Sequence, residues 1–392
     1  MEKHLGARIA AEIAATGPMP FTRFMELALT DPADGYYTGT TVRAGKTGDF
    51  ITAPELHPLL GSAIARTASE TWQRIGMPAS FTWIEFGAGA GALLCAAVEQ
   101  WHRDDAPILS ALNVMIVEAN PYRREELQAR LRALPGGGPQ VLPLQPVQAG
   151  IVIANEFLDA LPFHILVGRP TSKNGFMERC VSVAPNSADL CWVECEPEHS
   201  TVDRLREQLA GNPLVEGQLA EVSLAATAWV AALPSLLTSG LVLVLDYGRV
   251  SSELRDPATR MAGTALAYQG HRASTNLLAE PGERDLTAHV DLTALRGAAA
   301  AAGLTHIAAT TQAAYLASTG LDDEVARLRT GPEATLESAL ALRGALAHLM
   351  DPRRMGGFAV EAFALGSTEQ LARLTDEGNP LPGTAAPIRR LV

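Results

Sequence analysis

The order of apolar and polar positions along the chain predicts a parallel β-sheet covered by helices. From Phe81 onward, short apolar runs alternate with segments of helical periodicity, starting with FTWIEF, the glycine loop GAGAG and the helical segment ALLCAAVEQW. Further runs predicted as strands lie at 112–117, 140–144, 151–154, 241–246, 305–312 and 357–365. This alternation is typical of a doubly wound α/β sheet.

Other segments are expected to flank or interrupt this sheet. Helical patterns lie at 56–75, 217–233 and 291–304, and alternation around the polar break APNSAD predicts a hairpin between Phe163 and Cys195. The predicted organisation is an N-terminal cap or lid at 1–78, a sheet domain at 79–375 with insertions at about 163–216 and 315–350, and a mobile tail at 376–392.

Composition narrows the class of protein. A chain of 392 residues with 47% hydrophobic residues is large enough to bury a sizeable core. The net charge of −12 disfavours nucleic acid as a partner, because such proteins gather Lys and Arg against the phosphates. Four cysteines and the absence of a secretory pattern at the start predict a cytoplasmic protein, and the alanine-rich composition favours a bacterial source. The most apolar stretch, 230–245, is too interrupted for membrane insertion to be expected.

A glycine loop between the first strand of the sheet and its helix is the leading candidate for a cofactor site. Gly87, Gly89 and Gly91 let the backbone approach a ligand closely and direct helix N–H groups toward it. Dinucleotide sites share this spacing. Glu118, at the tip of the second strand, is placed to accept hydrogen bonds from ribose hydroxyls in either cofactor class.

Glu85, at the end of the first strand, favours one cofactor class over the other. A carboxylate there would repel a pyrophosphate by roughly 4 kcal/mol at an effective dielectric constant of about 20. The same carboxylate attracts the ammonium and sulfonium groups of S-adenosylmethionine, so the pattern favours this cofactor over NAD. In the alternative interpretation, the glycines only allow tight helix–strand packing and Glu85 interacts with the helix dipole.

The segment NEFLDALP follows the fourth strand, at the edge where open α/β sheets bind ligands. Its acids Glu156 and Asp159 are three residues apart, so one helical turn would place them on the same face. Carboxylates are natural partners of an arginine guanidinium, and acids that localise charge on its remote nitrogens favour methyl transfer to the near one. The alternative is structural: Asn155 caps a short helix, and the two acids complement its dipole.

Several segments together resemble one known family. GDFITAPELHPLLGSAIA, IEFGAGAGAL, NEFLDALPFH, LVLDYG, PGERDLTAHVDLTAL and TQAAYL follow one another in the order found in the MidA family, from about Phe21 to Leu365. Members of that family are S-adenosylmethionine-dependent methyltransferases, and the mitochondrial members assist assembly of respiratory complex I. The resemblance implies a class I methyltransferase sheet with a reversed last strand, S-adenosylmethionine as cofactor, and methylation of arginine in a partner protein.

The resemblance also implies roles for individual residues. Those expected to hold the cofactor are Glu85, Gly87, Gly89, Gly91, Glu118, Asn155, Asp49 and Thr52. Phe50 and Pro54, from the same GDF block as Asp49, are expected on the substrate side of the pocket. The chain departs from the family pattern at TALAYQGHRAS, where a basic or aromatic residue often replaces Ala267 or Gln269. This departure affects the prediction of the substrate more than the prediction of the cofactor.

Three further residues are candidates for binding substrate. Tyr247 follows the fifth strand, and Asp285 and His289 precede a helix. Each also has an ordinary structural explanation. For Tyr247 it is that buried tyrosines are common at strand ends. Asp291 would cap the helix, with His289 as a hydrogen-bonded loop histidine.

Cys191, Cys195 and His199 recur every fourth residue, which is a partial zinc-binding pattern. Structural zinc sites usually add a second close pair of ligands. Because the segment 190–194 has a strand pattern, apolar packing of the cysteines is favoured and no metal is expected.

The leading hypothesis is a cytoplasmic enzyme that transfers methyl from S-adenosylmethionine to arginine of a partner protein, with Glu156 and Asp159 as catalytic acids. The partner would be a protein substrate, such as a respiratory complex subunit. A second hypothesis is an assembly chaperone whose methyltransferase fold performs no chemistry, and the intact glycine loop and acids argue against it. A third, a nicotinamide-dependent oxidoreductase, is disfavoured by Glu85.

Overall fold

The chain folds into two compact units, each assembled from distant parts of the sequence. The computed structural model describes residues 4–39, 52–187, 189–332, 334–376 and 379–383. The accessory unit comprises Met1–Phe50, Leu158–Val230 and Gly248–Ala298, and the sheet unit comprises Ile51–Phe157, Ala231–Tyr247 and Ala299–Val392. The sequence instead predicted a cap followed by one continuous domain with insertions.

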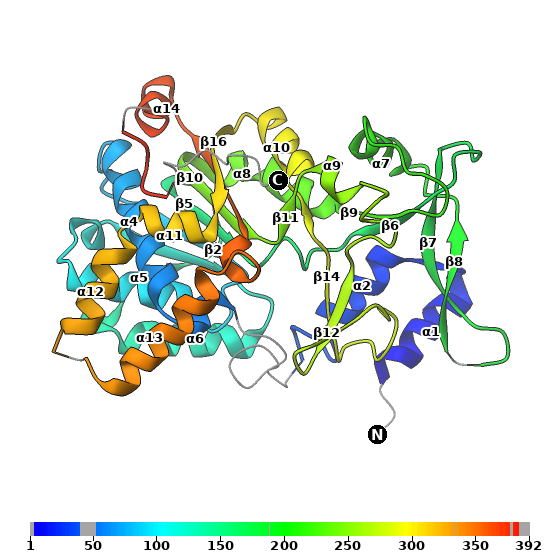
Figure 1. Ribbon diagram of the computed structural model, residues 1–392, viewed down its shortest axis with the longest axis horizontal. Helices are drawn as coiled ribbons and strands as arrows, with labels where there is room; N and C mark the ends of the chain where they lie inside the picture. The colour runs from blue at the N-terminus through cyan, green and yellow to red at the C-terminus, as the bar shows by residue number, and fades with distance from the viewer. Residues whose placement is uncertain (1–3, 40–51, 188, 333, 377–378, 384–392) are drawn as a thin grey trace. The chain divides into compact units, whose positions relative to one another are not determined.

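The sheet unit holds a seven-stranded sheet in the order β16-β17-β10-β5-β2-β3-β4 (Figure 1). Its strands are β2 (Phe81–Phe86), β3 (Leu112–Val117), β4 (Gln140–Leu142), β5 (Val147–Asn155), β10 (Leu237–Asp246), β16 (Thr305–Thr311) and β17 (Ala359–Leu365). Its helices are α3 (Ala53–Leu56), α4 (Leu59–Arg74), α5 (Ala92–Arg103), α6 (Pro121–Ala133), α11 (Gln312–Ser318), α12 (Leu321–Thr330), α13 (Leu336–Leu349) and α14 (Thr368–Leu374). Short 3₁₀ turns lie at η1 (Pro107–Ser110), η2 (Pro135–Gly137) and η3 (Met355–Gly357). The strands predicted for the sheet are confirmed.

The directions of the strands bring several strand ends to one edge of the sheet. β5 lies parallel to β2 and β10, and β3 lies parallel to β2 and β4. β17 is antiparallel to both β10 and β16, so it is the reversed strand that the resemblance implied. Because parallel strands end at a common edge, Phe86, Val117, Asn155 and Asp246 lie along the edge where open α/β sheets bind ligands.

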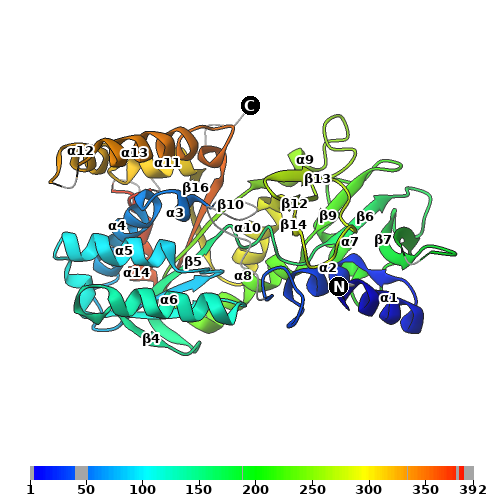
Figure 2. The ribbon, with the colours of Figure 1, turned by 90° about the horizontal axis from the view of Figure 1, so that it is seen from below.

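Buried apolar side chains hold the helices of the sheet unit to its sheet. Trp83 of β2 and Ile151 of β5 are fully buried and belong to one apolar cluster with residues of α4 and α5. Figure 2 shows α4, α5 and α6 lying along this sheet. Gly61 permits the close approach of α4 to α5, because a Cβ atom at this position would lie 2.5 Å from the Cβ of Ala96.

α3 and α4 form two helices where the sequence predicted one from 56 to 75. The break falls at His57, whose backbone is extended with φ −162° and ψ 147°. A residue that precedes proline disfavours the helical conformation, and Pro58 follows. The break leaves α3 as a separate four-residue helix beside the edge of the sheet.

The described part of the C-terminal segment packs against α4. Leu381 is fully buried, and the Thr67 hydroxyl donates a hydrogen bond to the carbonyl of Pro382 at 3.0 Å. Arg74 donates to the carbonyl of Pro380 at 3.3 Å. The segment predicted as a mobile tail therefore contains a stretch that is anchored to the sheet unit.

The accessory unit contains a five-stranded sheet and two smaller sheets. The five-stranded sheet is formed by β1 (Met19–Pro20), β6 (His164–Gly168), β7 (Phe176–Val183), β8 (Leu190–Cys195) and β9 (Leu219–Val222). The smaller sheets are β11 (Gly248–Arg249) with β15 (Val290–Asp291), and β12 (Leu266–Gln269) with β13 (Arg272–Ser274) and β14 (Asp285–Thr287). The helices are α1 (His4–Thr16), α2 (Phe21–Thr30), α7 (Val202–Leu209) and α9 (Ser251–Leu254), and the chain passes between units within α8 (Leu224–Leu236) and α10 (Leu292–Ala301).

One element of this region differs from the prediction. The predicted hairpin is present as β7 and β8, which pair antiparallel, and β7 also pairs with β1 and β6. The helix predicted from residue 217 begins only at Leu224, because β9 precedes it and pairs with β6. Ala220 and Val222 alternate into the core, and this period of two with a partner strand outweighs helical propensity over so short a stretch.

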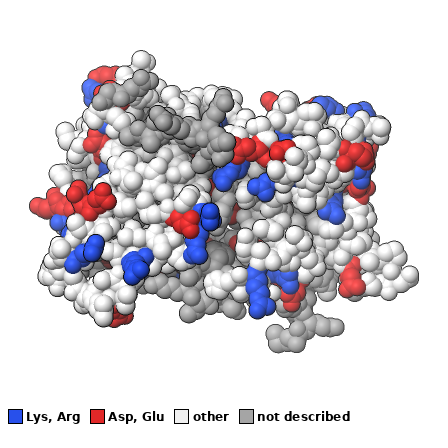
Figure 3. Space-filling view, in the orientation of Figure 1, with Lys and Arg blue, Asp and Glu red and all other residues white. Residues whose placement is uncertain are grey.

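Charged residues of both signs are interspersed on the face of the molecule drawn in Figure 3. Ion pairs of the described residues include Arg169 with Glu194 and Arg23 with Glu12. Within the part of the chain that the structure describes, no helix combines the length and apolar character needed to cross a membrane.

Candidate active site

The glycine loop connects β2 to α5 through three glycines in left-handed backbone conformations. The φ angles are +68° at Gly87, +54° at Gly89 and +77° at Gly91, which L-residues with a side chain rarely adopt. A Cβ atom would lie 3.1 Å from Phe157 if added to Gly87 and 2.5 Å from Leu127 if added to Gly91. At Gly89 it would meet nothing within 4 Å. Gly87 and Gly91 therefore fit against protein, whereas Gly89 borders open space.

Glu118 ties the glycine loop to the end of β3. Its Oε2 accepts a hydrogen bond from the amide of Gly89 at 2.7 Å, and its Oε1 accepts one from the amide of Asn120 at 2.8 Å. Each carboxylate oxygen can accept a further hydrogen bond. Glu118 can thus hold the loop in place and still accept hydroxyl groups of a ligand.

Glu85 is buried beneath the loop instead of forming an exposed anionic wall. Its residue surface is 3% exposed, and its Oε2 accepts a hydrogen bond from the indole of Trp83 at 2.8 Å. Burial raises the pKa of Glu85 to about 8; nearby Glu118 adds to this rise, and the Trp83 hydrogen bond opposes it. The sequence suggested an ionised Glu85, whereas at neutral pH its protonated form is favoured in the absence of a cation.

We expect Glu85→Gln to stabilise the protein selectively at alkaline pH. Folding raises the pKa of Glu85 from 4.5 to about 8, so the folded state favours the protonated carboxyl group. The stability that this protonated form contributes to the protein is fully present below pH 4.5 and is lost as the pH rises through 8. Glutamine accepts the Trp83 hydrogen bond and does not ionise, so it should raise the free energy of unfolding above pH 8 by on the order of a few kcal/mol.

Urea denaturation of both proteins between pH 5 and pH 9, in steps of about one unit, measures this difference. Trp83→Phe is measured alongside, because it removes the indole that donates the hydrogen bond to Glu85 and leaves the Glu85 carboxyl group in place. A gap between wild type and Glu85→Gln that is the same at every pH would contradict a raised pKa.

Glu156 lies in a turn directly after β5, and its carboxylate is held by hydrogen bonds within the sheet unit. Its carboxylate accepts hydrogen bonds from the amide of Ala53 at 3.2 Å, the side chain of Asn155 at 3.4 Å and the hydroxyl of Tyr247 at 3.2 Å. Its own φ is +49°, and its amide donates to the carbonyl of Leu245 at 2.8 Å. Left-handed backbone at a residue other than glycine stores strain, and such residues cluster at functional sites.

Two further features of this turn concern its neighbours. Asp246, at the end of β10, is 1% exposed and accepts hydrogen bonds from the amides of Phe157 and Tyr247 at 3.2 and 2.8 Å. It therefore fixes the backbone on both sides of the Glu156–Tyr247 contact. The Oδ1 of Asn155 is shielded from solvent and has no hydrogen-bond partner among the described residues. A buried acceptor in this state fits a site that binds a donor from a ligand.

Asp159 is not on a helical turn with Glu156, so the predicted shared face is wrong. Residues 156–162 form bends and turns, and the left-handed backbone at Glu156 prevents a helix from starting there. Asp159 belongs to the accessory unit, where its carboxylate accepts a hydrogen bond from the hydroxyl of Thr287 at 2.7 Å. Burial raises the pKa of Asp159 to about 6, against the opposing effect of the Thr287 hydrogen bond.

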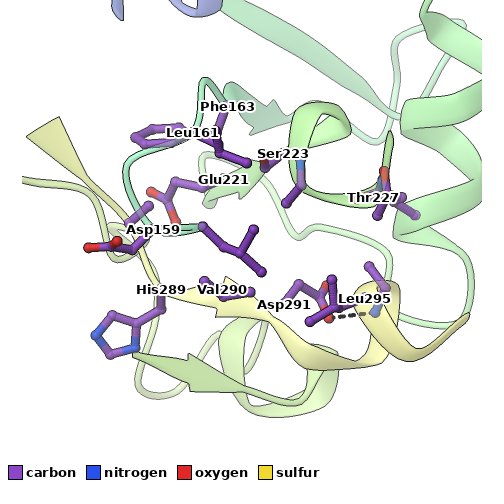
Figure 4. Close-up of a pocket in the computed structure, with 15 residues that line it drawn as sticks. Asp159, Leu161, Phe163, Glu221, Ser223, Thr227, His289, Val290, Asp291 and Leu295 are labelled. Atoms are coloured by element: carbon purple, nitrogen blue, oxygen red, sulfur yellow. Dashed lines mark hydrogen bonds between the residues drawn. The ribbon is translucent and has the colours of Figure 1, made fainter. Parts of the chain in front are cut away.

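Asp285 and His289 also belong to the accessory unit, near Asp159. The hydroxyl of Tyr37 donates to Asp285 at 2.7 Å, and Tyr268 is the cross-strand partner of Asp285 in β12 and β14. Asp159 and His289 both line a cavity of about 30 Å³ in this unit, which Figure 4 shows with Glu221 and Asp291. Asp159 and His289 therefore share one cavity, and Asp285 and Asp159 both add to the rise that burial causes in the pKa of Tyr37 and of Tyr268.

His289 and Asp291 differ in how they are bonded. Burial lowers the pKa of His289 to about 4, with nearby Arg260 and Arg249 adding to the effect, so its imidazole is neutral. Its Nδ1 has no hydrogen-bond partner among the described residues, contrary to the structural alternative. Asp291 accepts hydrogen bonds from the amides of Thr293 and Ala294, so the predicted helix cap is confirmed.

The GDF block is placed only in part. Asp49 and Phe50 lie outside the described residues. Thr52 is the N-cap residue of α3, and Pro54 is within that helix. Through the Ala53 amide, α3 contacts Glu156, so the end of this block does reach the edge of the sheet.

Gln312, at the start of α11, is a residue of this edge that sequence reasoning missed. It is fully buried, and neither atom of its side-chain amide has a hydrogen-bond partner among the described residues. Its backbone amide donates to the carbonyl of Phe358 at 2.9 Å, and the ring of Phe358 lies 4.2 Å from that of Tyr247. The segment TQAAYL contains this glutamine, but a motif does not reveal that the side chain is buried without a partner.

A family model described as "Putative S-adenosyl-L-methionine-dependent methyltransferase" matches residues 63–310. The sequence is 26% identical to "Protein arginine methyltransferase NDUFAF7, mitochondrial" of Danio rerio, across 99% of this chain and 92% of the relative. It is also 26% identical to the Drosophila melanogaster homologue of that protein, across 90% of this chain and 82% of the relative.

Two crystal structures of Burkholderia thailandensis proteins are similar in fold. An uncharacterised protein matches 98% of this chain and 94% of its own with a TM-score of 0.80 and 29% identity. A second protein, proposed to be a methyl transferase and bound to S-adenosyl-homocysteine, matches 94% of each chain with a TM-score of 0.78 and 29% identity.

Proposed function

Because the chain belongs to the family of S-adenosyl-L-methionine-dependent methyltransferases whose model matches residues 63–310, we propose that it methylates an arginine side chain of a partner protein. Relatives that align with most of the chain carry the name protein arginine methyltransferase. The observation that carries the proposal is the oriented carboxylate of Glu156 at the same sheet edge as the glycine loop.

The residues at the glycine loop fit this cofactor. The open space beside Gly89 leaves room for a ligand against the loop, and Glu118 can accept hydrogen bonds from the two ribose hydroxyls. When bound, S-adenosylmethionine supplies an electrophilic methyl group on a positively charged sulfur. A nearby cation also favours the ionised form of Glu85, so cofactor binding is expected to release a proton near neutral pH.

The residues near Glu156 are suited to orienting a guanidinium. A guanidinium presents five N–H donors in a plane, and a carboxylate fixed by hydrogen bonds within the protein provides an acceptor in one defined orientation. Methyl transfer to a guanidinium nitrogen requires that nitrogen to lose a proton, which passes to solvent after transfer. Glu156 would keep positive charge on the remote nitrogens and so favour attack by the near one.

Asp159, Asp285 and His289 are proposed to bind the substrate protein from the accessory unit. Besides burial, Asp285 and Asp159 both raise the pKa of Tyr37 and of Tyr268, so the two acids lie close enough together to favour a cationic group near them. Glu156 is then the proposed catalytic residue, and Asp159 is proposed to support substrate binding. A respiratory complex subunit is the proposed partner, and the four free cysteines accord with the cytoplasm as the proposed location.

Incubation with tritiated S-adenosylmethionine and a cell lysate tests the activity, with mass spectrometry of the labelled band. We expect a labelled protein with methylated arginine. A labelled lysine or glutamine would contradict the proposed substrate residue, and the absence of any labelled band would favour a chaperone without chemistry. Thermal shifts should appear with S-adenosylhomocysteine and not with NAD.

A further inference from the structure

Residues 52–55 carry the sequence of a helix capping box that the structure does not close. In the pattern T-x-x-E, the threonine side chain normally bonds the glutamate amide, and the glutamate side chain returns to the threonine amide. Thr52 and Glu55 stand at these positions of α3, yet Thr52 makes no side-chain capping bond. The Oε2 atom of Glu55 is shielded from solvent and has no hydrogen-bond partner among the described residues.

The start of α3 is capped instead by Glu156. The amide of Ala53, the first residue of the helix, donates to the Glu156 carboxylate at 3.2 Å, although the two residues are 103 positions apart. This contact places the four-residue helix, and Glu55 within it, beside the turn that carries Glu156. Among the described residues, the Glu55 side chain makes no capping hydrogen bond, so its carboxylate is not committed to the start of the helix.

A carboxylate oxygen that is shielded and unpartnered is costly unless a ligand supplies a donor. A carboxylate accepts hydrogen bonds and binds cationic donors most strongly, so a cationic ligand group suits this position best. Two such groups belong to the reaction: the guanidinium of the substrate and the ammonium of the cofactor. The cofactor cradle is formed at the ends of β2 and β3, whereas the helix that carries Glu55 is joined through its Ala53 amide to the Glu156 turn at the end of β5.

We propose that Glu55 is a second carboxylate that binds the substrate guanidinium together with Glu156. This inference rests on the proposed arginine specificity. It moves the second acid that binds the guanidinium from Asp159, which belongs to the accessory unit, to a residue of α3, the helix whose Ala53 amide is hydrogen-bonded to Glu156. A planar group with donors on two sides is oriented by two acceptors and not by one, so Glu55 determines specificity for a cationic, planar side chain.

Glu55→Gln, which keeps the shape and removes the charge, tests the proposal. The probes are S-adenosylhomocysteine in calorimetry and two synthetic peptides derived from the methylated site of the wild-type substrate, one with arginine and one with its uncharged isostere citrulline. We expect kcat/KM for the arginine peptide to fall about 10- to 100-fold, the range expected for one charge-assisted hydrogen bond. Glu55→Asp should recover part of this loss, and affinity for S-adenosylhomocysteine should stay within about twofold of wild type.

Competition by the citrulline peptide gives a readout that a purely structural role would not change. Wild type should bind the arginine peptide much more tightly than the citrulline peptide, and Glu55→Gln should lose most of that preference. Glu337→Gln is the matched control, because Glu337 is an exposed acid in the first turn of α13 in the same unit. Its kcat/KM should remain that of wild type.

Each contrary result has a defined meaning. Unchanged kcat/KM and unchanged peptide preference in Glu55→Gln would overturn the proposal while leaving arginine methylation intact. A selective loss of S-adenosylhomocysteine affinity would overturn it in favour of the cofactor ammonium as the partner of Glu55. If wild type methylates a residue other than arginine, the proposed function itself fails, and this is established before any variant is compared.

Discussion

Glu156→Gln is expected to lower turnover strongly while leaving the cofactor site intact. Glutamine can still accept the hydrogen bond from the Ala53 amide, so the turn and α3 should keep their positions. It carries no negative charge, however, and the charge of a fixed carboxylate is what orients the guanidinium and stabilises charge that develops during transfer. We expect kcat to fall about 10²- to 10³-fold, with affinity for S-adenosylhomocysteine within about threefold of wild type.

Two further variants serve as comparisons: one tests the backbone conformation of Glu156, and the other is a control at an exposed acid. Glu156→Gly relieves the left-handed conformation at φ +49°, so it should unfold at an equal or higher temperature than Glu156→Gln and lose turnover to a similar extent. Glu99→Gln, an exposed acid of α5, should retain full turnover. Normal turnover in Glu156→Gln would remove this carboxylate from the mechanism.

Gly89→Val is expected to lose cofactor binding and, with it, all methyl transfer. The φ of +54° is unfavourable for a β-branched residue by about 1–2 kcal/mol, which strains the loop. The valine side chain would also occupy the open space beside the loop, where the ligand is proposed to lie. Strain and occlusion act together, so we expect affinity for S-adenosylhomocysteine to fall at least about 100-fold by calorimetry.

The control for backbone strain is Gly270→Val. Gly270 has the same φ of +54°, and a Cβ atom there also meets nothing within 4 Å, but it lies between β12 and β13 of the accessory unit. It should lower thermal stability about as much as Gly89→Val and leave S-adenosylhomocysteine affinity unchanged. Equal losses of affinity in both variants would mean that general destabilisation, and not the glycine loop, explains the effect.

Much of the sheet unit and of its site could be predicted from the sequence, because the relevant signals are local. Apolar runs of strand length gave the strands of the sheet, and the glycine spacing after β2 gave the loop. The order of motifs gave the family, which the family model then confirmed over residues 63–310. These features depend on residues close together in the chain, so they can be recognised in the sequence without knowledge of the fold.

The tertiary structure alone decided how the acids behave. Glu85 was expected to be an ionised carboxylate that attracts a cationic cofactor, but burial beside Trp83 raises its pKa to about 8, and desolvation is not encoded in a motif. Asp159 was expected to share a helical face with Glu156, yet a left-handed residue prevents that helix. The contacts of Glu156 with Ala53 and Tyr247 join residues 103 and 91 positions apart.

Sequence by itself therefore determined which elements form and which family they belong to. Charge state, hydrogen-bond partners and the division of the acids between two units required the folded chain. The physical reason is the separation along the chain of the residues that determine each property. Secondary structure follows from neighbours in sequence, whereas pKa values and hydrogen bonds depend on atoms that only folding brings within a few ångströms.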